Sequence, residues 1–115
     1  MKRWSAVAVV LAVAVTGCSK EADCEAFMSE NTAFAAAVVS ANEKDGVDGA
    51  RKTFDALKGE LRKRWDLIKD ARGFQVKEET RKRVKENRDA AHESVCALHD
   101  PKVCDEYAAL FDEGP

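Results

Sequence analysis

Strand patterns and prolines are the two features that this 115-residue chain most clearly lacks. After Cys18, no run of β-branched residues alternates with polar residues, so the signature of a half-buried strand is missing. Pro101 and Pro115 are the only prolines, and alanine, glutamate, lysine and arginine dominate the composition. These residues favour helices. The sequence therefore predicts an all-α protein.

The common signatures of catalysis are also missing. The sequence contains no nucleophile elbow, no glycine-rich phosphate loop and no HExxH zinc motif. His92, Glu93 and Ser94 are sequence neighbours, so on a helix their side chains point in different directions and form no relay. We therefore expect a protein that is not an enzyme and that needs no cofactor.

No apolar run in the chain is long enough to cross a membrane. The longest covers residues 6–15, and the uncharged stretch around it covers residues 4–17. A membrane-spanning helix needs about 20 apolar residues. Lys2 and Arg3 precede this stretch, and Lys20 and Glu21 follow it closely. A basic start, a short apolar run and a charged continuation are typical of a cleaved signal segment.

The end of this leader is its most informative part. Val15-Thr16-Gly17 places small residues directly before Cys18. Residues 1–18 thus resemble a bacterial lipoprotein signal peptide, whose lipobox ends in a cysteine that is acylated, with palmitate for example, and becomes the first mature residue. The resemblance implies removal of residues 1–17 and a membrane anchor at Cys18. With Ser19 next, it implies the periplasmic face of the outer membrane. A plain secretory signal, which leaves Cys18 an ordinary thiol, is the alternative.

Residues 18–115 are enough for one small domain. Apolar residues recur at helical spacing over three long segments, about 21–42, 48–72 and 76–99, and over a short one, about 101–112. Three long helices with short connections predict an up-down-up bundle, over whose far end the short fourth helix folds back.

Particular residues mark the boundaries of these helices. We expect Gly46 to end the first helix as a left-handed cap and Gly73 to end the second. Asp100 is expected to be the N-cap of the fourth helix, and Pro101 its first residue.

The second segment carries the clearest apolar stripe, and the polar positions beside it are equally informative. Asn31 and Asn87 fall near core registers, where polar residues can fix the register of a bundle. Arg62, Lys63 and Lys69 are expected to face solvent. The predicted buried stripe consists of Phe54, Leu57, Leu61, Trp65 and Ile68.

Three cysteines remain after Cys18, namely Cys24, Cys96 and Cys104. An exported chain meets an oxidising compartment, where a disulfide is the default. A tight turn at Pro101 would bring Cys96 and Cys104 within the Cα separation of about 4.4–6.8 Å that a disulfide needs. The sequence therefore predicts a Cys96–Cys104 bond. Pairing of Cys24 with one of the other two is the alternative.

A metal site is a competing interpretation of the same region. His92, Cys96 and His99 stand at i, i+4 and i+7 on one helical face, and Cys104 could complete a tetrahedral set for zinc or copper. Against this interpretation, the spacing matches no common motif, and a disulfide would consume both thiols.

Charge is unevenly distributed along the chain. Residues 51–88 hold 14 basic and 7 acidic side chains, whereas residues 18–50 carry a net charge of −5 and residues 89–115 a net charge of −6. A basic surface of this kind suits anionic partners such as lipid headgroups, lipopolysaccharide, cell-wall polymer or an acidic protein. Solvated helix faces are the alternative. The densest basic points are Arg62, Lys63, Arg64, Arg81, Lys82 and Arg83.

Three functions are compatible with these features of the sequence. The leading hypothesis is a lipid-anchored module of the bacterial cell envelope that binds another envelope protein or an anionic polymer. Nucleic acid is not an expected partner, because no aromatic residues interleave with the basic clusters. The alternative is a small ligand- or metal-binding lipoprotein that uses His92, Cys96, His99 and Cys104. An effector or immunity-type lipoprotein is the third.

Overall fold

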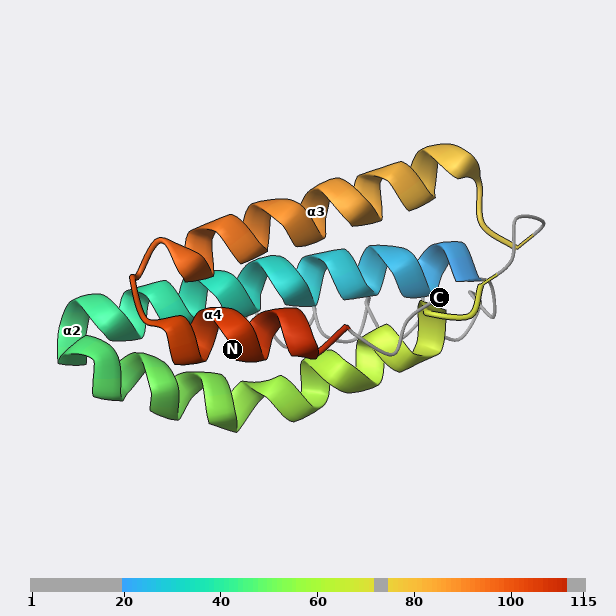
Figure 1. Cartoon of the computed structure of the whole chain (residues 1–115). Helices are drawn as coiled ribbons and strands as arrows, with labels where there is room; N and C mark the ends of the chain where they lie inside the picture. Colours follow the sequence, from blue (N-terminus) through green and yellow to red (C-terminus); the bar gives the residue numbers. More distant parts are fainter. Residues whose placement is uncertain (1–19, 72–74, 112–115) are drawn as a thin grey trace, which may run out of the picture.

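A computed structural model describes residues 20–71 and 75–111 of the chain. It contains the helices α2 (Lys20–Ile68), α3 (Glu78–Cys96) and α4 (Pro101–Ala109). Helix α2 reverses direction at Gly46, so it forms two antiparallel arms, which we name the first arm (residues 20–45) and the second arm (residues 47–68) (Figure 1). The described residues thus form an all-α, up-down-up bundle with a short additional helix, as the sequence predicts.

The two arms, α3 and α4 pack side by side. Figure 1 shows α3 along the first arm, and α4 between α3 and the second arm. The Gly46 reversal and the turn between α3 and α4 lie together at one end, which we call the turn end. Lys20, Ile68 and the start of α3 lie at the other, the Lys20 end. The fold therefore brings residues far apart in sequence together at each end.

Gly46 makes the chain reversal with backbone angles that only glycine adopts readily. Its φ of 73° is positive, as expected for this position, but its ψ of −162° lies outside the left-handed helical region. The expected left-handed cap is therefore wrong, and helical geometry resumes directly after the reversal. Gly49 is also constrained, since a Cβ there would lie 2.5 Å from the Cβ of Asp45.

Tertiary contacts account for one of the differences between predicted and observed helix boundaries. Helix α3 begins at Glu78 rather than near residue 76. Its N-cap residue Lys77 contributes no side-chain cap. Instead, the Glu21 carboxylate on the first arm accepts hydrogen bonds from the Lys77 backbone N–H and from the Thr80 hydroxyl, the latter at 2.6 Å. The pKa of Glu21 is lowered by these two hydrogen bonds.

The C-terminal ends of the second arm, α3 and α4 fall short of the sequence-based boundaries, whereas the first arm continues past the predicted end at about residue 42. The second arm ends at Ile68 instead of about residue 72, and α4 ends at Ala109 instead of about residue 112. Helix α3 ends at Cys96 rather than residue 99: the backbone N–H groups of Leu98 and His99 bond to carbonyls three residues back, and His99 has a positive φ of 63°. The predicted stop at Gly73 lies outside the described residues. At the start of α4, the expected N-cap Asp100 and first residue Pro101 are confirmed.

Aromatic side chains fill the centre of the bundle. The rings of Phe27, Trp65 and Phe111 lie with centroids 5.1–5.8 Å apart, and Phe34 meets Phe54 at 5.1 Å. These tilted and edge-on arrangements are the favoured ones for aromatic pairs. The aromatic contacts therefore join both arms to the segment that follows α4, and α3 and α4 add smaller apolar residues and Tyr107 to the same core.

Four of the five residues in the predicted stripe of the second arm are buried, and one is not. Phe54, Leu61, Trp65 and Ile68 are core residues, whereas Leu57 is 38% exposed. At 3.6 residues per turn, Leu57 lies about 60° around the helix from Phe54, at the flank of the stripe. The prediction that Leu57 is buried is therefore wrong.

A polar network crosses the otherwise apolar core. The Asn31 amide is fully buried and donates to Asn87 Oδ1 at 2.7 Å, while its oxygen accepts from the Tyr107 hydroxyl at 2.6 Å. Asn87 in turn donates to the Thr32 hydroxyl at 2.9 Å. Burial raises the pKa of Tyr107 to about 12, so this hydroxyl stays protonated as a donor at neutral pH. The network connects the first arm to both α3 and α4.

Candidate functional site

The turn between α3 and α4 brings together most of the residues with distinctive chemistry. Cys96 and Cys104 form a disulfide across it, with their Cα atoms 4.6 Å apart, as the sequence predicts. The alternative pairing of Cys24 is wrong, because Cys24 is a free thiol. The tight turn at Pro101 that places the two cysteines together is the one anticipated from the sequence.

An ion pair between the buried Asp100 and the partly exposed Arg51 fixes this turn to the second arm. The Arg51 guanidinium donates two hydrogen bonds to the Asp100 carboxylate, at 2.8 and 2.9 Å. Asp100 also accepts a 3.3 Å hydrogen bond from the Lys102 backbone N–H as the N-cap of α4. The Arg51 guanidinium is the main cause that lowers the pKa of Asp100. Asp100 therefore connects the turn both to the second arm, through Arg51, and to the start of α4, through Lys102.

His92 lies directly against the disulfide. Its Nε2 atom is 3.8 Å from Cys104 Sγ, and its ring stacks on Tyr107 with a centroid separation of 5.9 Å. The potential ligand atoms of His92, Cys96 and Cys104 all lie within 4.8 Å of one another, and all three residues are half-buried. We refer to these three residues as the His–Cys cluster.

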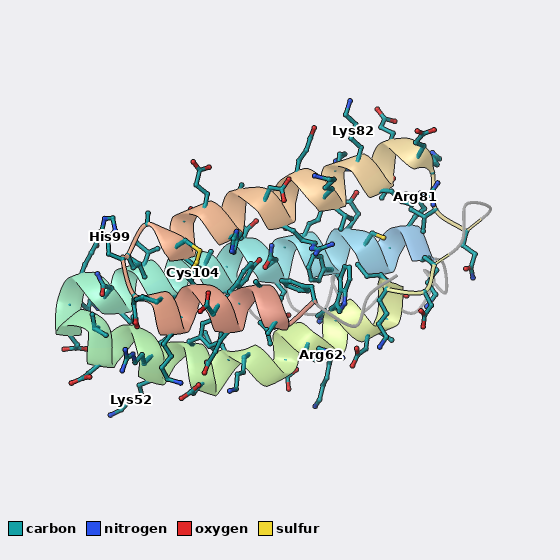
Figure 2. The ribbon with its side chains drawn as sticks, viewed as in Figure 1. Lys52, Arg62, Arg81, Lys82, His99 and Cys104 are labelled. Atoms are coloured by element: carbon teal, nitrogen blue, oxygen red, sulfur yellow. A yellow bond between two sulfur atoms is a disulfide. The ribbon has the colours of Figure 1, made fainter. Side chains whose placement is uncertain are left out.

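His99 does not belong to the His–Cys cluster. It is exposed, and Figure 2 shows its ring apart from the disulfide at Cys104. The positive φ of His99 ends the helical register that would have put it on the same face as His92 and Cys96. The structure therefore brings together three of the four metal-ligand candidates that the sequence suggests.

Cys24 is the remaining thiol among the described residues, and it is not positioned to react. The side chain is 3% exposed in the first arm. Burial raises the pKa of Cys24 to about 11, and the nearby carboxylates of Glu21, Asp23 and Glu25 act in the same direction. Because the thiolate is the reactive form, we interpret Cys24 as a core residue.

The basic cluster on the second arm is largely neutralised by ion pairs. Arg62 pairs with Asp66 at 2.9 Å and Arg64 pairs with Glu30 at 3.2 Å. Lys63 lies 3.4 Å from Glu60. These carboxylates reduce the attraction of this cluster for an external anion.

The basic cluster on α3 points elsewhere. Arg83 pairs with Glu25 at 2.7 Å, whereas Arg81 and Lys82 are exposed at the start of the helix. Figure 2 shows Arg62 and Lys82 extending from opposite sides of the bundle. The six basic residues singled out in the sequence therefore do not form one surface.

A shallow groove runs between the first arm and α3. One hollow of about 340 Å³ is lined mainly by small side chains, including Ala35, Ala36, Ala90 and Ala91. It adjoins a more polar hollow through Thr32 and Asn87, which line both. The groove is where α3 packs through small rather than large residues.

The long-range partners of several residues in the turn and the network could not be identified from the sequence. Arg51 and Asp100 are 49 positions apart, and Asn31 and Tyr107 are 76 apart, so no local pattern connects them. The sequence indicated a structural role for Asn31, because its polar side chain falls in an apolar register. Nothing in the sequence distinguished Arg51, since it is one of many basic residues on the same helix.

Comparison of the chain with protein-family models, with curated proteins and with solved structures finds no match. Among residues 20–71 and 75–111, no helix is long and apolar enough to span a membrane. The predicted lipidation residue Cys18 and the leader before it lie outside the described residues.

Proposed function

We propose that the protein is a bacterial lipoprotein that is anchored in the cell envelope through Cys18 and uses its helical bundle to bind an envelope protein or anionic polymer. The observation that carries this proposal is the order of the leader: Lys2 and Arg3, ten apolar residues, and Val15-Thr16-Gly17 before Cys18. A diacylated cysteine holds a protein in a membrane durably, whereas one acyl chain binds only marginally.

The start of α2 supports a close approach of the bundle to the membrane. Helix α2 is described from Lys20, two residues after Cys18, and two residues span at most about 7 Å. Lys20 Nζ donates to the Leu67 backbone carbonyl, and Glu21 accepts from Lys77. An anchor at Cys18 would therefore place the Lys20 end of the bundle, to which both arms and α3 contribute, beside the lipid surface.

The start of α3 is the better candidate for the partner surface. Arg81 and Lys82 are exposed there, whereas Arg62 and Lys63 have carboxylates within ion-pair distance. Unpaired surface cations attract an anionic partner more strongly than cations already paired. We assign the contact with the partner to Arg81 and Lys82. The proposal includes no catalytic step and no nucleic acid.

Mass spectrometry of the protein extracted from membranes tests the anchor. We expect a mature chain that begins at Cys18 and carries acyl chains. Cys18→Ala should abolish acylation and release of the leader, whereas Cys24→Ala, which removes a buried thiol, should leave both unchanged. A soluble wild-type protein with a free Cys18 thiol or an uncleaved leader would rule out the anchor.

Binding to lipopolysaccharide micelles and to isolated cell-wall sacculi tests the partner surface. The double variant Arg81→Ala/Lys82→Ala should bind several-fold more weakly than the wild-type protein, and the difference should shrink at high salt because screening weakens exposed charges. Arg62→Ala/Lys63→Ala removes the same charge from the second arm. Equal losses from the two double variants would contradict the assignment to α3.

A further inference from the structure

The His–Cys cluster has the composition of a metal site, although its two thiols are joined in a disulfide. His92 and Cys96 are separated by one helical turn on α3, so they project from the same face. Cys104 reaches them from the first turn of α4. One imidazole and two thiolates are ligands that zinc accepts readily.

The distances in the cluster are close to those of a tetrahedral zinc site. With Zn–N of about 2.0–2.1 Å and Zn–S of about 2.3 Å, a tetrahedral site separates nitrogen from sulfur by about 3.6 Å and two sulfurs by about 3.8 Å. His92 Nε2 and Cys104 Sγ are already 3.8 Å apart. The two sulfur atoms have to separate, and the ligand atoms of His92 and Cys96, which lie within 4.8 Å of each other, have to reach the same spacing; the Cα atoms of the two cysteines stand 4.6 Å apart.

The surroundings would hold these ligands in place after the disulfide opens. The imidazole of His92 is stacked on Tyr107, whose hydroxyl is fixed by Asn31. The turn that carries Cys104 is held by the two hydrogen bonds from Arg51 to Asp100. Because neither set of contacts involves the disulfide, the approach of α3 to α4 does not depend on the covalent bond alone.

We propose that the His–Cys cluster is a redox-controlled zinc site, closed while Cys96 and Cys104 are joined and open to Zn²⁺ when they are reduced. A dithiol reductant supplies two electrons and two protons, so the S–S bond breaks, two thiols form and the reductant becomes a disulfide. Zn²⁺ then displaces the two thiol protons and binds both thiolates and His92 Nε2. Three protein ligands leave a fourth position for water.

The site does not depend on the proposed anchor or partner surface. The three zinc ligands are residues other than Cys18, Arg81 and Lys82, on which the anchor and the partner surface rest. Failure of the zinc site therefore leaves the envelope proposal unaffected, and failure of the anchor leaves the zinc site unaffected. Zinc bound by thiolates would also protect the reduced cluster from reoxidation, because the disulfide cannot form again until the metal leaves.

Titration of the purified full chain with Co²⁺ and then Zn²⁺ tests the proposal. The protein is reduced under anaerobic conditions with an immobilised phosphine, and its helical content is checked by circular dichroism before metal is added. We expect one Co²⁺ per chain, with thiolate-to-metal charge-transfer absorption and the intense d–d bands of tetrahedral coordination, and displacement of Co²⁺ by Zn²⁺. The oxidised protein should show neither signal.

Matched variants identify the ligands. His92→Ala should weaken zinc binding by roughly tenfold or more, because loss of a direct ligand costs at least as much as loss of an outer-shell partner. His99→Ala and Cys24→Ala, which alter residues outside the cluster, should bind like the wild-type protein. The proposal is overturned if the reduced protein binds no metal or loses its helices. Equal binding by the oxidised protein, or the same affinity in His92→Ala, would overturn it as well.

Discussion

The second arm of α2 and helix α3 are held in the same bundle by different means. The second arm buries large side chains, Phe54, Leu61 and Trp65 among them. Helix α3 buries only Thr80, Val84, Ala91 and Val95, none of which is large. Burial of apolar surface contributes about 25 cal/mol per Å², so the second arm has the greater share of this term.

Directional contacts compensate for the small side chains of α3. Glu21 caps its first turn, Asn87 bonds to Asn31 near its middle and the Cys96 disulfide closes its end. The Arg88 guanidinium adds a cation–π contact, 4.6 Å from the ring centroid of Trp65. Apolar burial tolerates small shifts, whereas a hydrogen bond weakens quickly when its geometry changes. The comparison suggests that the second arm supplies stability and that the contacts of α3 set its register.

The largest loss of stability on substitution is expected in the second arm, where large side chains are buried. Leu61 is fully buried, so Leu61→Ala should lower the free energy of unfolding by about 2–5 kcal/mol through lost burial and the cavity left behind. Leu57→Ala removes the same atoms from an exposed position four residues earlier and should cost about 1 kcal/mol or less. Chemical denaturation of both variants measures the difference. Similar losses would show that the register assigned to this arm is wrong.

The next largest effect should come from the polar network of α3. Asn31→Ala leaves Asn87 and Tyr107 without buried partners and should cost about 1–3 kcal/mol. Thr32→Ala removes an exposed partner of Asn87, which water can replace, and should cost less. In a double-mutant cycle, adding Tyr107→Phe to Asn31→Ala should cost less than Tyr107→Phe alone. Strict additivity of the two changes would contradict the network.

The cap on α3 should make stability depend on pH. Because the pKa of Glu21 is lowered below its ordinary value of 4.5, its contribution is fully present above pH 4.5 and is lost as the pH falls through the folded-state value. Glu21→Gln should therefore be less stable than the wild-type protein at neutral pH, and the two should converge in acid. Glu78→Gln, which removes an exposed charge from the same turn but leaves both hydrogen bonds of Glu21 in place, should be closer to the wild-type protein in stability at neutral pH. Unfolding free energies measured from neutral to acidic pH provide the comparison.

The smallest effect is expected at the surface of the second arm. The Lys63 side chain is 76% exposed and its ion pair with Glu60 spans 3.4 Å. Exposed pairs of this kind contribute about 0–1 kcal/mol. Lys63→Ala should therefore change the free energy of unfolding by no more than about 0.5 kcal/mol. A larger loss in a thermal melt would mean that Lys63 makes a stabilising contact beyond this pair.

The difference between apolar burial in the second arm and polar contacts in α3 also explains how much of the fold could be predicted from the sequence. Apolar periodicity located both arms, α3 and α4, and it was clearest where large side chains recur at helical spacing, as in the second arm. It also placed Trp65 and Leu61 in the core. At the flank of the stripe it failed for Leu57, whose burial depends on whether another helix covers it.

Long-range polar contacts could not be predicted in the same way. The start of α3 depends on Glu21, which is 56 residues away from Lys77, and its end depends on the backbone of His99. The disulfide was predictable because its cysteines flank a recognisable Asp100–Pro101 turn. The position of His92 against Cys104 followed from the helical register, whereas the exclusion of His99 required the structure.

The hydrogen bonds at the Lys20 end have a mechanical consequence. A pull on an anchor at Cys18 would enter the bundle beside Lys20 and Glu21, whose contacts with Leu67 and Lys77 lie at the very edge of the helix packing. A load directed across the first arm would break these two contacts before the deeper packing of the arm. The disulfide lies near the opposite end and joins residues only eight positions apart, so the force reaches it last. Under tension from the membrane, the first arm would yield early while α3 and α4 stay joined.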